Sequence, residues 1–148
     1  MQLTQHTDFG LRLLIVLTRT GGGPISLPSF AAEQQLSYNH VAKVAQALVR
    51  AGFIRSLRGR NGGVQLARSP AEMTVGDVVR ALEPGMRMAD CANCQLRLGC
   101  ETSSILAEAV GAFMAVLGRT TLEVAAQSAR PAFSAWSAAT RSDPASPG

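Results

Sequence analysis

All three cysteines of the chain lie in the segment CANCQLRLGC, as Cys91, Cys94 and Cys100. A disulfide framework explains them poorly, because an odd number of cysteines cannot pair fully. Thiolates grouped in this way bind zinc or iron–sulfur clusters, or act as redox switches. Three ligands are one short of a closed site, and Asp90 and Glu101 are the local oxygen candidates for the fourth. The residues themselves leave the iron–sulfur, zinc and thiol-switch interpretations open.

Positive charge is concentrated in the first half of the chain. Residues 1–70 hold eight basic and two acidic side chains, whereas residues 71–148 hold six basic and eight acidic ones. An asymmetry of this kind favours nucleic-acid binding by the basic half. No histidine or paired carboxylates accompany the cysteines, so an enzyme is not expected.

The order of predicted elements in the basic half is that of a winged helix-turn-helix. Apolar spacing and capping residues predict helices over 6–20, 25–36 and 37–52, and residues 53–67 read as a strand, a glycine-rich turn and a second strand. We therefore predict a mainly α fold with a small β-hairpin, whose winged helix-turn-helix domain spans residues 1–83.

The third predicted helix divides into an apolar and a polar stripe, as a DNA-recognition helix requires. The following hairpin places arginines around a turn suited to a minor groove or a phosphate backbone. No second histidine lies near His40 in the sequence, so we expect this residue to contact DNA rather than a metal. The DNA-binding candidates are Ser37, Tyr38, Asn39, His40, Lys43, Gln46, Arg50, Arg55, Arg58 and Arg60.

The second half is expected to hold the cysteine loop and a dimerisation helix. A fourth helix runs from a capping-box-like start to Glu83, a loop covers 84–103, a long helix covers 104–127, and 128–148 form a flexible tail. Apolar residues in the long helix follow heptad-like steps that indicate a helix–helix seam. These dimer candidates are Leu106, Val110, Phe113, Leu117 and Val124.

Nothing near the start of the sequence resembles a targeting or membrane-spanning segment. The apolar run at 11–17 is too short to cross a bilayer, and Asp8 and Arg12 are unsuited to a signal peptide. We expect a soluble, cytoplasmic protein with reduced cysteines and no membrane partner.

The segments MQLTQHTDFGLRLLIVL, SYNHVAKVAQALVRAGFIRSLRGRNGGVQLA and TVGDVVRALEP, followed by the cysteines, resemble a known family over residues 1–127. It comprises winged-helix iron–sulfur transcriptional regulators that include NsrR and IscR, and the nitric-oxide-sensitive NsrR repressors are the nearer likeness. IscR-like members carry a histidine shortly after the third cysteine, which ETSSIL here lacks. The two-residue gap between Cys91 and Cys94 is shorter than the family's usual spacing; since such pairs hold [4Fe–4S] clusters elsewhere, we favour that type over [2Fe–2S].

The resemblance implies a homodimeric repressor of double-stranded operator DNA, gated by an iron–sulfur cluster that senses nitric oxide or another redox or iron signal. It implies that Cys91, Cys94 and Cys100 ligate the cluster together with Asp8 from the partner subunit. Arg12 would lie beside these ligands, hydrogen-bonded near the cluster. The alternative is a zinc-stabilised or thiol-switched winged-helix DNA-binding regulator.

Overall fold

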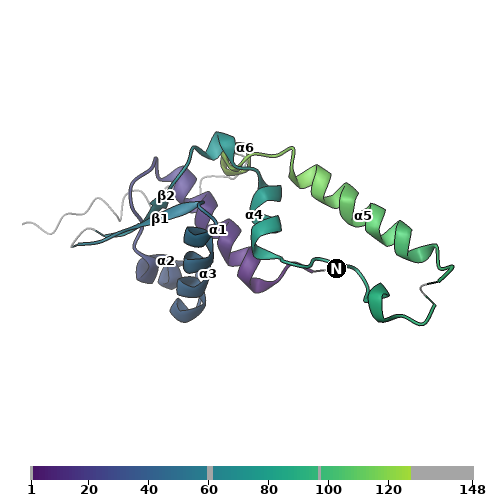
Figure 1. Ribbon diagram of the computed structural model, residues 1–148. Helices are drawn as coiled ribbons and strands as arrows, with labels where there is room; N and C mark the ends of the chain where they lie inside the picture. The colour runs from purple at the N-terminus through teal and green to yellow at the C-terminus, as the bar shows by residue number, and fades with distance from the viewer. Residues whose placement is uncertain (1, 60–61, 97, 128–148) are drawn as a thin grey trace, which may run out of the picture.

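A computed structural model describes residues 2–59, 62–96 and 98–127. It confirms a mainly helical chain with one antiparallel hairpin, in which Ile54 pairs with Leu66 (Figure 1). The predicted tail, 128–148, lies outside the described residues. The elements are α1 (Gln5–Arg19), α2 (Leu27–Glu33), α3 (Tyr38–Arg50), β1 (Ile54–Leu57), β2 (Gly63–Leu66), the 3₁₀ turn η1 (Pro70–Glu72), α4 (Val75–Leu82), the 3₁₀ turn η2 (Cys91–Asn93), α5 (Thr102–Leu117) and α6 (Leu122–Gln127).

The core forms where the apolar faces of α1 and α3 meet. Leu13 and Leu17 of α1 and Val44 and Leu48 of α3 are all almost completely buried. The spacing of four residues within each pair places both of its members on one side of the helix. Fully burying one such side chain contributes roughly 1.5–3 kcal/mol, so these contacts hold the recognition helix firmly against α1.

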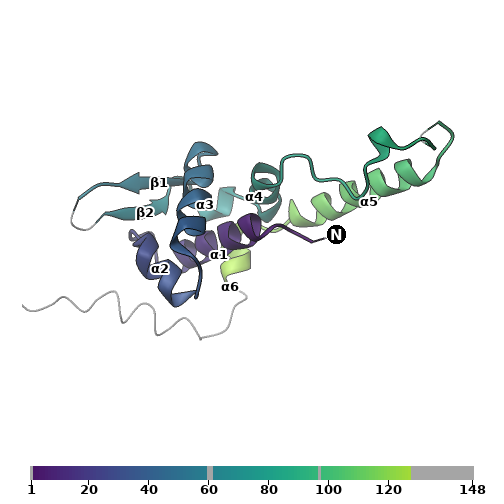
Figure 2. The same cartoon turned by 90° about the horizontal axis from the view of Figure 1, so that it is seen from below.

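The hairpin is attached to the helical core at its base. Ile25 and Val64 exchange two backbone hydrogen bonds of 2.9 Å, which connect β2 to the segment before α2. Gly63 permits this close approach, because a Cβ there would collide with the carbonyl of Ile25. From this base the strands β1 and β2 project away from the helices as a wing (Figure 2).

The predicted single helix over 104–127 is wrong, since the chain contains two helices, α5 and α6, in that range. After Leu117 the chain turns back, and a backbone hydrogen bond of 2.8 Å joins the N–H of Val75 to the carbonyl of Thr120. Leu122 is completely buried in the core of the winged helix. Val124 therefore belongs to α6 and cannot continue a seam along α5.

α5 projects away from the winged helix, and the cysteine loop lies at its far end in both views (Figures 1 and 2). None of the residues of α5 is fully buried. No helix in the described part of the chain is long and apolar enough to cross a membrane.

Candidate nucleic-acid interface and cysteine loop

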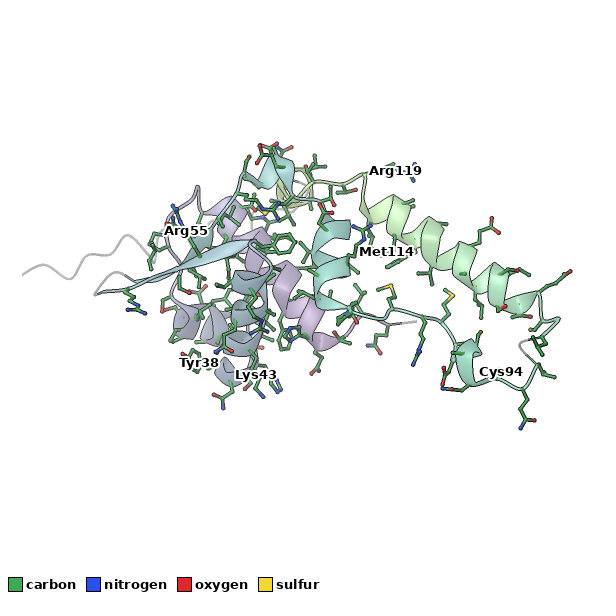
Figure 3. The ribbon with its side chains drawn as sticks, viewed as in Figure 1. Tyr38, Lys43, Arg55, Cys94, Met114 and Arg119 are labelled. Carbon is green, nitrogen blue, oxygen red and sulfur yellow. The ribbon has the colours of Figure 1, made fainter. Side chains whose placement is uncertain are left out.

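The structure exposes the polar stripe predicted on the recognition helix α3. Tyr38 and Lys43 point outward along the same edge of the winged helix, and Tyr38 is 50% exposed (Figure 3). Ser37 precedes the helix as its N-cap. The remaining candidates on this helix are also exposed, and they are Asn39, His40, Gln46 and Arg50.

The wing carries two of the predicted arginines within the described residues. Arg58 is exposed directly after β1. Arg55 lies against the side-chain amide of Gln65, its partner across the hairpin, which holds this guanidinium along the strand. Arg60 lies outside the described residues. Arg55 and Arg58 of the wing and Lys43 and Arg50 of α3 are thus exposed positive charges of the kind that contact the phosphates of a duplex.

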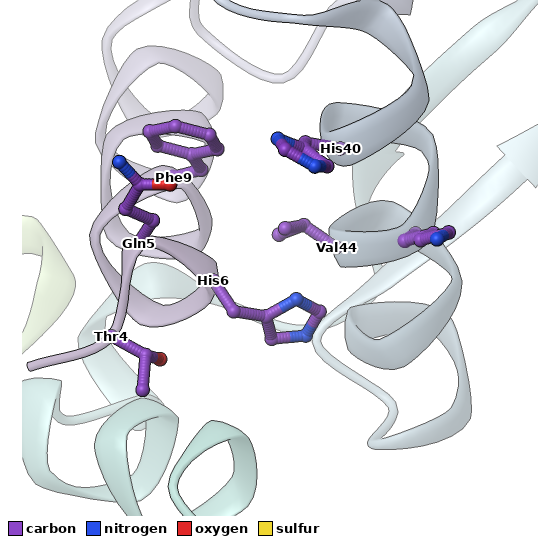
Figure 4. A pocket seen from close by; sticks show the side chains of 7 residues that line it. Thr4, Gln5, His6, Phe9, His40 and Val44 are labelled. Carbon is purple, nitrogen blue, oxygen red and sulfur yellow. The ribbon is translucent and has the colours of Figure 1, made fainter.

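The two histidines of the chain come together beside the recognition helix. The ring of His40 packs against Phe9 of α1, with 6.5 Å between ring centroids. His6 lines the same pocket, which is bounded by the start of α1 and the first turns of α3 (Figure 4). His6 and His40 therefore line one pocket although they are far apart in the sequence. Only the packing of α1 on α3 brings these residues together, so no local signal reveals the pair.

The cysteine loop presents three free thiols. Cys91 begins η2, and the N–H of Cys94 donates to the carbonyl of Cys91 at 3.3 Å. Cys100 comes just before α5, where hydrogen bonds from the side chain and backbone of Thr102 and from the backbone of Ser103 lower the pKa of its thiol. A lowered thiol pKa increases the thiolate fraction, and thiolate is the form that binds metal or attacks a disulfide.

Asp8 lies on α1, away from the cysteines of its own chain. Its carboxylate forms a two-point ion pair with Arg12, at 2.7 Å and 3.1 Å. Among the described residues, no three histidine, cysteine, aspartate or glutamate side chains are grouped closely enough to hold one metal ion. The donor chemistry nevertheless fits a cluster, because its iron atoms take thiolates individually.

The apolar residues of α5 face two ways. Leu106 and Val110 line a cavity of about 360 Å³ with Met86, Met88 and Cys91 of the same chain. These two predicted dimer residues are thus directed at their own cysteine loop, and Phe113 and Leu117 are also half-buried. A second stripe, to one side of the first around the helix, is exposed, with steps of four, three and four residues: Ile105, Ala109, Ala112 and Val116.

Comparison with known proteins agrees with this arrangement. The HTH-type transcriptional regulator NsrR of Shouchella clausii is 36% identical over 129 residues, which are 83% of this chain and 87% of that protein. The structure of T. potens IscR matches with a TM-score of 0.73 and 28% identity, covering 88% of this chain and 89% of that one.

The oxidised form of Staphylococcus aureus CymR also matches, with a TM-score of 0.71 and 32% identity over 88% of this chain and all of that one. These relatives include transcriptional regulators and no enzyme, in agreement with the expectation from sequence. A family model described as an iron-dependent transcriptional regulator matches residues 3–128, and the chain therefore belongs to the Rrf2 family of DNA-binding transcriptional regulators.

Proposed function

We propose that this protein is a homodimeric repressor whose operator affinity is gated by an iron–sulfur cluster responding to nitric oxide or another redox signal. The observation that carries the proposal is the loop of three free thiols, one with a lowered pKa, in a protein whose exposed α3 and wing suit DNA. Similarity to NsrR and to an iron-dependent family supports the cluster and the signal.

Cys91, Cys94 and Cys100 would hold the cluster, for which we favour the [4Fe–4S] type. When bound, such a cluster supplies iron atoms that small molecules such as nitric oxide can reach. The cavity beside Cys91 is lined largely by apolar side chains, among them Met86 and Met88 of the loop and Leu106 and Val110 of α5. The chain therefore provides soft thiolate ligands with apolar side chains beside them.

The fourth ligand in this proposal is Asp8 of the other subunit. Within one chain, the loop lies beyond the start of α1 and at the far end of α5 (Figure 1). Arg12 would orient the Asp8 carboxylate, with which it forms a two-point ion pair in the single chain. The next residue, Phe9, is buried against His40 of the recognition helix. A displacement of Asp8 would therefore be transmitted to α3 through this ring contact.

Metal analysis of protein purified without oxygen is the first test. Iron with a comparable amount of acid-labile sulfide would support the cluster. Zinc without sulfide would instead make the loop a zinc-stabilised element and refute nitric-oxide sensing through iron.

Asp8→Asn tests whether Asp8 ligates the cluster of the other subunit. In wild-type protein, nitric oxide should weaken binding to an operator selected from random duplexes by about 5- to 150-fold, the range of typical allosteric coupling. The variant should lose most of this response, because an amide is a poor ligand for iron, whereas Glu108→Gln on α5 should keep it. Normal switching in Asp8→Asn would contradict the cross-subunit ligand.

A thiol switch is the second candidate, favoured by the lowered pKa of Cys100 and by the likeness to CymR, which has been solved in an oxidised form. This candidate predicts a change in DNA affinity that a dithiol reductant reverses in protein lacking iron, sulfide and zinc.

A further inference from the structure

The pocket between the start of α1 and α3 has the character of a ligand site separate from the cysteine loop. It has a volume of about 310 Å³ and is lined by Thr4, Gln5, His6, Phe9, His40, Lys43 and Val44. Figure 4 shows His6 reaching across from α1 toward α3, with His40 opposite Phe9.

The polar side chains that line this pocket are rich in hydrogen-bond donors. His6, His40 and Lys43 can all donate hydrogen bonds and Gln5 adds a neutral donor, while none of the described residues lining the pocket is an aspartate or a glutamate. Glu83 interacts electrostatically with His6 but does not line the pocket. Its Oε1 already accepts hydrogen bonds from Thr4 and Thr7 at 2.7–2.8 Å. The free hydrogen-bonding capacity of the pocket therefore suits a negatively charged group.

The floor of the pocket is apolar. Phe9 is 9% exposed and Val44 is 1% exposed, and both present hydrocarbon to the cavity. A bare phosphate would leave this floor uncovered. Small-molecule sites combine an apolar lining with a few converging polar groups, and their volumes begin near 300 Å³.

We propose that this pocket binds a small organic anion, in which a carboxylate or phosphate group is carried on a compact apolar or aromatic body. The anionic group interacts with His6, His40 and Lys43, and the body lies on Phe9 and Val44. Since His40 and Lys43 also belong to the recognition helix, a bound ligand and a DNA duplex compete for the same side chains. This site requires no cluster, so its test is independent of the function proposed above.

Phenyl phosphate is a suitable probe, because it joins the two features in one molecule. We would titrate it into the full-length protein without DNA and follow the imidazole signals of the two histidines by NMR. It should bind about tenfold more tightly than either phenol or inorganic phosphate, which each lack one of the features. His6→Gln should weaken this binding by about three- to tenfold, with His40 as the reporter, whereas Arg119→Gln, in the connection between α5 and α6, should not.

Two results would overturn the proposal. One is binding of phenyl phosphate no tighter than that of its two fragments, or equally tight in His6→Gln. The other would come from binding to duplex DNA, measured over a range of salt concentrations. If the slope of log affinity against log salt concentration became smaller by about one in His6→Gln, the basic rim of the pocket would be assigned to a backbone phosphate of DNA.

Discussion

Glu83 illustrates how a single carboxylate positions the elements around the candidate site. Its Oε1 accepts hydrogen bonds from the backbone N–H and hydroxyl of Thr4 and from the hydroxyl of Thr7. Burial raises the pKa of Glu83, but these hydrogen bonds together lower it below the ordinary value of 4.5. The end of α4, where the cysteine loop begins, is thus fixed to the start of α1, one residue from Asp8.

Glu83→Gln should lower the free energy of unfolding of the apoprotein at pH 7 by about 1 kcal/mol, because hydrogen bonds to a charged acceptor are stronger than those to an amide. The folded-state pKa lies below 4.5, so ionised Glu83 stabilises the fold above that pH. This contribution is lost as the pH falls through the folded-state pKa. Urea unfolding between pH 7 and pH 3 measures both effects.

The exposed Glu123 of α6 provides the matched control for this carboxylate. Glu123→Gln should leave both the stability at pH 7 and its decline in acid close to those of the wild type. If Glu83→Gln lost stability between pH 4.5 and pH 3 as steeply as the wild type, the network around its Oε1 would not be the cause.

The wing offers a prediction at the level of a secondary-structure element. Arg58 is exposed where β1 leads into the turn, so Arg58→Ala should weaken DNA binding by roughly 1–3 kcal/mol without changing stability. Binding assays over a range of salt concentrations check this. Arg119→Ala removes the same charge from the connection between α5 and α6. An equal loss of affinity in that variant would mean that net charge alone is responsible.

Local signals predicted most of the helices and strands. Thr74 and Asp77 form the capping box that starts α4, and the glycine-rich segment after Leu57 separates the two strands. The break between α5 and α6 was missed, because it depends on backbone hydrogen bonds with residues distant in the sequence: Val75 donates to the carbonyl of Thr120, and Leu122 donates to that of Met73. The sharing of one pocket by His6 and His40 likewise depends on tertiary packing, here of α1 on α3, which no local pattern reveals.

The joint between α4 and the α5–α6 connection yields a second prediction for an element. A Cβ on Gly76 would lie 2.8 Å from the backbone nitrogen of Gly118, so Gly76→Ala should destabilise the protein by about 1–3 kcal/mol. Gly111 of α5 has no neighbour within 4 Å of the same position. Gly111→Ala should therefore stabilise the helix by about 0.5–1 kcal/mol. Thermal unfolding distinguishes the two, and equal effects would refute the close packing of this joint.

In the single chain, α5 leaves large apolar side chains exposed to solvent. Ile105 is 60% exposed and Val116 is 54% exposed, and Ala109 and Ala112 between them are small enough to let another helix approach closely. The residues predicted from heptad spacing instead face inward, since Leu106 and Val110 line the cavity beside Cys91. We infer that two copies pack through the outer stripe, which leaves the inner face to support each cysteine loop.

This inference predicts which substitutions separate the subunits. Ile105→Glu and Val116→Glu should each shift sedimentation from dimer to monomer at micromolar protein concentration, because a carboxylate buried without a partner is costly in an apolar interface. The same substitutions should weaken operator binding, since a monomer meets only one half-site. Ser104→Glu adds an equal charge on the same helix but off the stripe, and it should leave the dimer intact. Dissociation caused by Leu106→Glu, with Ile105→Glu remaining dimeric, would show that the heptad seam and not the outer stripe joins the subunits.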